Sequence, residues 1–139
     1  MDIVIQPHGQ KSREVGDNDI DRVIEDAQKM FKLCVNGCIA LAHSQIESND
    51  PLRFFVTQDK IFINPVITRY TKAFVKSEEG CRTFSGKKPV QIDRHWRIEF
   101  EFQVIDMHKL SEIQHAKVKG LSAFVVQHEI DHMDAKYIY

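Results

Sequence analysis

The sequence predicts an α+β fold, in which antiparallel β-sheets pack around a buried HExxH helix and a further helix lies near the N-terminus. Three observations support this prediction. Apolar residues recur at helical spacing over residues 19–35, they alternate with polar residues from about 97 to 105, and a segment that starts near Gly120 is apolar on two sides of a helix. One helix, then several strands, then one buried helix is the order expected of an α+β protein.

The first helix is predicted over residues 19–35. Its apolar residues are three or four positions apart, as one buried helix face requires: Ile20, Val23, Ile24, Ala27, Met30, Phe31 and Cys34. The polar residues 17–19 can cap its start, and Asn36-Gly37 is a typical stop signal. We therefore expect an amphipathic helix packed against a core.

The middle of the chain predicts short strands joined by turns. Residues 53–57 are rich in strand-forming side chains, and the polar residues 58–60 read as a turn. Residues 61–63 predict a second strand, which we expect to end at Asn64-Pro65 because proline cannot donate to a sheet.

The clearest strand covers residues 97–105. Every second residue is apolar, which predicts one buried and one exposed face: Ile98, Phe100, Phe102 and Val104. Residues 106–109 read as a hairpin turn, and the chain then returns through Leu110 to Val118.

The last helix is predicted to begin near Gly120. One of its faces carries apolar residues and two histidines: Leu121, Phe124, Val125, His128 and His132. A second stripe is apolar throughout: Val126, Ile130 and Met133. Apolar residues on two sides predict a helix inside the fold.

The composition excludes several classes of protein. With 139 residues, 42% apolar and 28% charged, the chain is long enough for a single domain, which we expect to cover residues 1–139. No run of about 18 apolar residues is present, and a formal charge of −1 provides no general attraction to nucleic acid. We therefore expect neither a membrane partner nor direct nucleic-acid specificity.

Cysteine usage and the N-terminal residues indicate the compartment. The cysteines are too few, and odd in number, for a disulfide framework: Cys34, Cys38 and Cys81. No basic stretch followed by an apolar stretch opens the chain, so no secretory signal is expected. We expect a cytoplasmic protein, or one inside an organelle or a virus-infected bacterial cell.

The strongest chemical signal is the run His128-Glu129-Ile130-Asp131-His132. Histidines four residues apart project from one helix face, so both imidazoles can bind one metal ion. Glu129 lies beside them, where it can act as a general base towards a metal-bound water. The alternative is a chance match on a solvated helix, which the apolar flank at residues 124–126 disfavours.

A catalytic site of this kind needs a third protein ligand. Seven residues follow His132, and Asp134 is too near along the helix to reach the same ion easily, so we expect the ligand upstream. Cys81 is the favoured candidate, because a thiolate and two imidazoles leave a fourth tetrahedral position open to water. An ordinary HExxH peptidase, by contrast, takes its third ligand from downstream.

Two further segments accompany the HExxH helix. Residues 38–45 read C-I-A-L-A-H-S-Q, residues 79–83 read E-G-C-R-T, and residues 127–135 read Q-H-E-I-D-H-M-D-A. In this order they resemble the motifs of the peptide deformylase family, which are G-x-G-x-A-A-x-Q, E-G-C-L-S and Q-H-E-x-D-H-x-x-G. The third motif is highly specific, the second fairly specific, and the first weak.

The sequence departs from these motifs mainly in the first. Cys38 and Ala40 replace its glycines, and His43 replaces its second alanine. The added bulk and the polar ring can narrow the cleft or shift the substrate preference. The motif glutamine and the glutamate of HExxH are kept, so we expect an active enzyme.

The resemblance implies a ligand set and a metal. Cys81, His128 and His132 would hold one divalent ion, which would make the buried helix a metal-binding helix. This ligand set suits Zn²⁺, whereas the resemblance favours Fe²⁺ in the cell, with Zn²⁺ or Ni²⁺ also able to occupy the site.

The resemblance also implies a reaction. The substrate would be a newly made polypeptide that begins with N-formylmethionine, and the products would be formate and a free amino terminus. Glu129 would take a proton from the metal-bound water and pass it to the leaving amine. The Gln45 side chain and the backbone N–H of Arg82 would stabilise the negative charge on the formyl oxygen.

The substrate's methionine side chain needs an apolar pocket. Four residues are expected to line it by position: Ile39, Leu121, Phe124 and Val125. Each of them could equally be ordinary core. Glu79 and Asp131 are expected to orient the metal ligands through hydrogen bonds, with a surface salt bridge as the alternative for either.

We expect a monomer that acts on N-formylmethionyl polypeptides. A further expected partner is the ribosome, near the exit from which the new polypeptide emerges. Two other functions fit the same residues: a catalytically inert metal-binding or regulatory homologue, and a metal amidohydrolase that acts on another small amide. Cys34, Cys38 and His43 have a spacing that suits a second metal, but the two cysteines are better explained as small packing residues.

Overall fold

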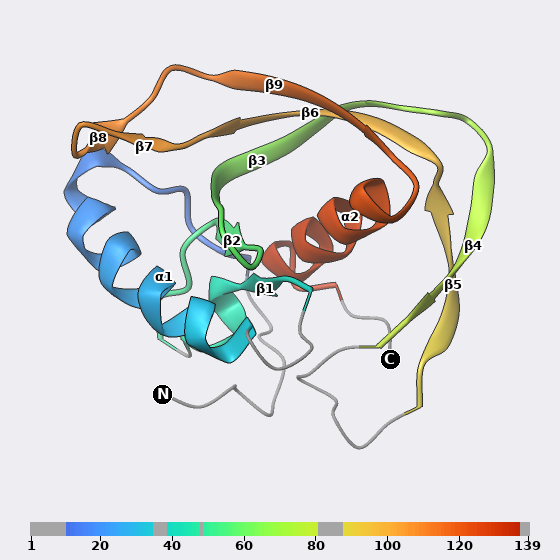
Figure 1. The fold of residues 1–139 in the computed structure, drawn as a ribbon, viewed down its shortest axis with the longest axis horizontal. Helices are drawn as coiled ribbons and strands as arrows, with labels where there is room; N and C mark the ends of the chain where they lie inside the picture. The colour runs from blue at the N-terminus through green and yellow to red at the C-terminus, as the bar shows by residue number, and fades with distance from the viewer. Residues whose placement is uncertain (1–10, 35–38, 48, 81–87, 137–139) are drawn as a thin grey trace.

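The computed structural model describes residues 11–34, 39–47, 49–80 and 88–136 (Figure 1). The strands β3, β6 and β9 arch over helix α2, and helix α1 lies on the far side of β1 and β2. The predicted mixture of antiparallel sheets and two helices is therefore present. Among the described residues, no helix is long and apolar enough to cross a membrane.

Helix α1 spans Ile20–Cys34 and follows a 3-10 turn at Asp17–Asp19, close to the predicted range. The Asp19 carboxylate accepts the Gly16 N–H at 2.9 Å, which caps the start. The buried face is mostly the predicted one: Ile20, Val23, Ala27, Met30 and Cys34, with Asp26 as a polar member. The predicted stop at Asn36-Gly37 lies outside the described residues.

The main sheet has five antiparallel strands in the order β1-β2-β3-β6-β9. Their bounds are Leu41–Ala42, Phe54–Val56, Ile61–Tyr70, Arg97–Gln103 and Gln114–Lys119. Two smaller pairs accompany it, and their bounds are Phe74–Glu79 with Val90–His95 for β4-β5, and Ile105–Asp106 with Lys109–Leu110 for β7-β8.

Strand β2 lies between two cores and is buried on both faces. Phe54 belongs to the core under α1, whereas its neighbour Phe55 belongs to the core under α2. Side chains alternate along a strand, so two adjacent phenylalanines serve opposite faces.

The predicted end of a strand at Asn64-Pro65 is wrong, because β3 continues to Tyr70. Asn64 has a positive φ of 51°, and the pairing with β6 shifts register between Ile63 and Val66. The Asn64 amide donates to Val15 O at 2.9 Å and to the Gln103 side chain at 3.0 Å, and its oxygen accepts the Val15 N–H at 2.8 Å. The proline thus lies at a β-bulge, where no ladder N–H is required.

Strand β6 shows the predicted alternation in its first half, where Ile98 and Phe100 are each 2% exposed against α2. The strand ends at Gln103, before the predicted end, and Phe102 and Val104 are only half-buried. The predicted turn at 106–109 is also present, as a hairpin between β7 and β8. Its central residues, Met107 and His108, both have positive φ, which is the geometry of a tight two-residue hairpin loop.

Helix α2 spans Leu121–Met133 and starts after Gly120, as predicted. Its apolar stripe faces the core: Val126, Ile130 and Met133. Gln127 fixes the helix to β5, because its amide accepts the His95 N–H and donates to the His95 carbonyl, both at 2.9 Å. The opposite face, with His128, is left less buried and towards the candidate site.

Candidate metal centre

The two histidines of α2 converge on one point. Their Nε2 atoms are 3.0 Å apart, and His132 is 2% exposed. Two nitrogen ligands on a tetrahedral zinc ion, each about 2.0–2.1 Å from the metal, would lie roughly 3.3 Å apart. The pair is therefore spaced as two ligands of one ion would be.

The second nitrogen of His128 faces a carboxylate. His128 Nδ1 lies 2.7 Å from Glu79 Oε1, on the neighbouring strand β4. With the proton on Nδ1 and donated to Glu79, the Nε2 atom keeps its lone pair and points towards His132. This carboxylate–histidine arrangement orients ligands at many metal sites.

A buried arginine holds that carboxylate in place. Arg94 of β5 donates two hydrogen bonds to Glu79, at 2.8 and 2.7 Å, and a third to Asp131 at 2.6 Å. Burial alone would raise the pKa of Glu79, but the hydrogen bonds from Arg94 and His128 outweigh it and lower that pKa to about 2. Glu79 is therefore a carboxylate at neutral pH.

Arg94 is a residue of this network that the sequence analysis did not identify. A signal was present, because residues 90, 92 and 94 alternate inward along β5. That alternation places Arg94 on the buried side, where a charge requires an acidic partner. Strand period alone could not identify the partner, which lies 15 residues away at Glu79.

His132 and Glu129 lie deeper in the fold. Burial first, and the neighbouring His128 second, lower the pKa of His132 to about 3, so its ring is neutral and has a lone pair to offer. Glu129 is 4% exposed, and a ligand atom of each of these three residues lies within 4.8 Å of the others. An acid and two imidazoles are thus assembled on α2, with the Glu79–Arg94 network of β4 and β5 beside them.

Gln45 lies on the 3-10 turn His43–Gln45 that follows β1 and contacts α2. It is 4% exposed, and its Oε1 accepts the Ala42 N–H at 2.9 Å. Because the amide oxygen accepts this N–H, the NH₂ group is the end of the Gln45 side chain that can donate to a substrate. Cys81 and Arg82, the predicted third ligand and backbone donor, lie outside the described residues, directly after Gly80.

The four predicted pocket residues differ in exposure. Ile39 is 56% and Leu121 64% exposed, so neither is ordinary core, whereas Phe124 and Val125 are half-buried. The Phe124 ring meets the exposed Trp96 edge-on, with centroids 6.0 Å apart.

Asp26, His43 and Glu47 form a second cluster with the spacing of metal ligands, but they belong to an ion-pair network. His43 Nε2 lies 2.8 Å from Asp26, and its Nδ1 accepts the Leu52 N–H at 2.8 Å. The Arg22 guanidinium lies 3.8 Å from Asp26 and 3.0 Å from Glu47. Both ring nitrogens are engaged and a cation is present, so this cluster does not suit a metal.

The same geometry corrects the expectation that His43 adds a polar ring to the cleft. Its side chain is fully buried and stacks on Phe54, with ring centroids 4.6 Å apart. The ring points towards α1 because Asp26 provides a partner there.

Comparisons with solved structures place the fold. A PDF from the Vibrio parahaemolyticus bacteriophage VP16T, solved in complex with actinonin, superposes with a TM-score of 0.82 at 29% identity, covering 99% of this chain and 100% of that one. A probable peptide deformylase from Synechococcus phage S-SSM7 gives 0.80 at 27% identity, with 97% and 96% covered.

Sequence comparisons agree. A peptide deformylase of Staphylococcus epidermidis is 30% identical over 127 residues, which are 83% of this chain and 66% of that protein. One from Thermus thermophilus is 36% identical over 88 residues, covering 63% and 43%. The chain thus spans less than two thirds of the length of these curated relatives. The polypeptide deformylase family model matches residues 4–139, almost the whole chain, and the chain therefore belongs to that family.

Proposed function

We propose that the chain is a metal-dependent peptide deformylase, which hydrolyses the formyl group from the N-terminal formylmethionine of newly made polypeptides and releases formate. The observation that carries the proposal is the pair of converging imidazoles on α2, with Glu129 beside them and Glu79 behind His128. Membership of the family supplies the substrate class.

The donor set fits one divalent ion. Cys81, His128 and His132 would hold it, with Fe²⁺ as the ion in the cell and Zn²⁺ or Ni²⁺ as substitutes. When bound, the ion would acidify a water molecule and polarise the formyl oxygen. Glu79 fixes the tautomer of His128, and Arg94 fixes Glu79, so the imidazole lone pairs are oriented before the ion arrives.

The remaining steps belong to the protein's own groups. Glu129 accepts the proton of the attacking water and delivers it to the leaving amine. The Gln45 NH₂ group and the Arg82 backbone N–H donate to the formyl oxygen as negative charge grows on it. The Gln45 side chain is already held by the Ala42 N–H without substrate, which reduces the reorganisation needed in the transition state.

The substrate's methionine side chain would lie against apolar groups beside the metal centre. Phe124 and Val125 are half-buried, and the exposed Ile39 and Leu121 leave apolar surface that a side chain can cover. Asp131, held by Arg94, would orient the helix end that carries His132. We further propose a cytoplasmic monomer that meets its formylated polypeptides near the ribosome.

Formate release tests the proposal directly. The protein is loaded with Fe²⁺ or Ni²⁺ without oxygen and given a formyl-Met tripeptide, with the acetyl-Met tripeptide as matched control. We expect formate from the first substrate and no acetate from the second. A folded, metal-loaded protein that releases no formate is an inert homologue, and equal cleavage of both substrates indicates a less selective amidohydrolase.

A further inference from the structure

The face of α2 that carries the two histidines of the candidate metal centre continues for two more turns towards the start of the helix. Gly120, Phe124, His128 and His132 follow one another at intervals of four residues, so they form one stripe along the helix. Successive members are about 6 Å apart along the axis. Phe124 is half-buried. It is therefore the first apolar group of the stripe that a substrate side chain meets when it extends from the metal centre towards Gly120.

Trp96 lies over the start of this stripe. It occupies the bend between β5 and β6, and its carbonyl accepts the Gly120 N–H at 2.9 Å. The benzene edge of its indole is so close to the helix that a Cβ on Gly120 would lie 3.4 Å from Cη2. Gly120 also has a positive φ of 63°, which favours glycine. The glycine thus allows the indole to pack directly against the backbone at the start of α2.

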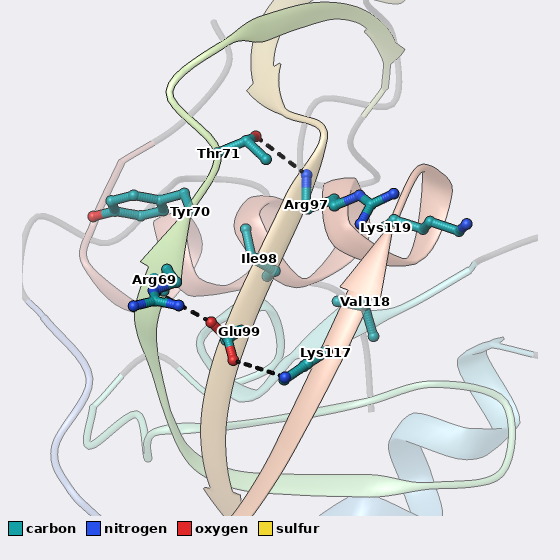
Figure 2. A pocket seen from close by; sticks show the side chains of 9 residues that line it. All are labelled: Arg69, Tyr70, Thr71, Arg97, Ile98, Glu99, Lys117, Val118 and Lys119. Atoms are coloured by element: carbon teal, nitrogen blue, oxygen red, sulfur yellow. Dashed lines mark hydrogen bonds and ion pairs between the residues drawn. The ribbon is translucent and has the colours of Figure 1, made fainter.

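The strand that follows shows which side of the main sheet the indole shares. Glu99 belongs to the charged outer face, where it lies between Arg69 and Lys117 (Figure 2). Ile98, by contrast, is 2% exposed and packs in the core beneath α2. Trp96 is two residues before Ile98, so its side chain is on the same inner side, in agreement with its contacts to the helix.

The position of Trp96 is fixed by the same helix that carries Phe124. Gln127 of α2 bonds both backbone groups of the preceding residue, His95, at 2.9 Å. The indole meets the Phe124 ring edge-on, with ring centroids 6.0 Å apart. An edge-on pair of this kind is a favourable aromatic arrangement. The two rings therefore form one unit at the start of α2.

The indole limits where the Phe124 ring can lie. A helical side chain leans towards the N-terminus and covers the turn before its own Cα, so Phe124 would lie over Gly120 if that surface were free. Trp96 occupies that surface. The Phe124 ring is then left with the space towards His128, on the side of the candidate metal centre.

We propose that Trp96 is a positioning residue that sets the length of the methionine pocket, because it holds the Phe124 ring towards His128. The inference rests on the proposed deformylase function and adds a determinant of substrate choice to it. The far end of the pocket is one aromatic ring supported by another, so a side chain longer than methionine meets a wall that cannot withdraw. One methylene more or less in an apolar pocket changes kcat/KM by about 10–200-fold.

Ethionine tests the length of the pocket, since it is methionine with one more methylene. The metal-loaded protein is given formyl-ethionine and formyl-Met tripeptides, and the ratio of the two kcat/KM values is measured. We expect Trp96→Ala to raise the ratio of formyl-ethionine to formyl-Met about tenfold, and Trp96→Phe to keep most of the original selectivity. Phe74→Ala is the matched control, because it removes another exposed ring, which contacts His95 and not Phe124. Its ratio should equal that of the unchanged protein.

A double variant shows whether Trp96 acts through Phe124. In Phe124→Ala the wall itself is removed, so the ratio should already be high, and adding Trp96→Ala should not raise it further. Two outcomes would overturn the proposal. One is an equal loss of kcat/KM for both substrates in Trp96→Ala, which is the result of a structural role alone. The other is a further rise of the ratio in the double variant.

Fluorescence separates this inference from the proposed reaction. Trp96 is the only tryptophan in the sequence, so its emission reports on this position alone. In Glu129→Gln, which should bind substrate without turnover, a formyl-Met tripeptide should change the emission in a saturable way, and a formyl-Gly tripeptide should not. An unchanged protein that releases no formate would refute the proposed reaction. The titration would still decide the pocket, because equal responses to the two peptides would overturn it.

Discussion

Replacing Arg94 with methionine tests whether the charge network behind His128 holds the site together. Arg94 is 7% exposed and donates two hydrogen bonds to Glu79, which is 9% exposed, and one to Asp131. Methionine fills a similar volume without a charge, so a buried carboxylate would lose its guanidinium partner. Removing one partner of a buried ion pair costs about 3–5 kcal/mol, a large share of the roughly 5–15 kcal/mol that stabilises a typical domain.

Urea unfolding followed by circular dichroism measures this loss. Arg94→Lys keeps the charge but cannot make the two parallel bonds to Glu79, so we expect it to recover only part of the stability. Lys76→Met is the matched control on the same pair of strands, because it breaks the exposed Lys76–Asp93 ion pair at 2.6 Å. An exposed pair contributes about 0–1 kcal/mol.

Metal affinity provides the second readout. With Glu79 no longer held against His128, we expect Arg94→Met to lower the affinity about 10–100-fold in a chelator competition, the usual effect of losing a group that orients a ligand. A stability loss no larger than that of Lys76→Met, together with unchanged metal affinity, would refute the reasoning, because the network would then behave as a surface salt bridge.

Three further outcomes are expected. Glu129→Gln should keep its metal but lower kcat by about 10²–10⁴-fold, because only the proton carrier is lost, and a loss within about tenfold would exclude Glu129 as the base. Cys81→Ser should lower metal affinity in the same chelator competition, and an unchanged value would identify a different third ligand. Burial lowers the pKa of His43 despite the opposing hydrogen bond that its ring donates to Asp26, so below the ordinary pKa of 6.5 the unfolded chain takes up a proton more readily than the folded one. The free energy of unfolding should therefore fall as the pH drops from about 6.5 towards 5, and fall less in His43→Gln, whereas equal slopes in urea titrations would count against this origin.

The elements that could be predicted are those whose pattern is local. The alternation of β6 and the spacing in α1 each follow from a single periodicity, so both were located within a few residues. The turn between β7 and β8 was recognisable from polar residues between two apolar runs. The HExxH spacing belongs to the same kind of signal, because four residues on a helix always place two side chains on one face.

The errors arise where distant residues decide the local structure. Asn64-Pro65 has the composition of a strand end, but contacts from Val15 and Gln103 stabilise a bulge there instead. Arginine is usually exposed, but the hydrogen bonds to Glu79 and Asp131 make the burial of Arg94 favourable. In each case the partner lies more than ten residues away, and no periodicity in the sequence reports it.

His43 and Asp26 form a pair that neither position explains alone. Asp26 is 8% exposed on the apolar face of α1, and His43 is fully buried. A lone carboxylate or a lone imidazole at either place would be destabilised by the loss of its hydration. The 2.8 Å contact between the two groups satisfies Asp26 and one ring nitrogen of His43, and the Leu52 N–H satisfies the other ring nitrogen. Because His43 opens the turn that ends at Gln45, the pair ties α1 to the segment that would donate to the formyl oxygen. The polar ring in the first motif therefore supports the site from the core, and its replacement by alanine would act on Gln45 through the turn rather than by widening the cleft.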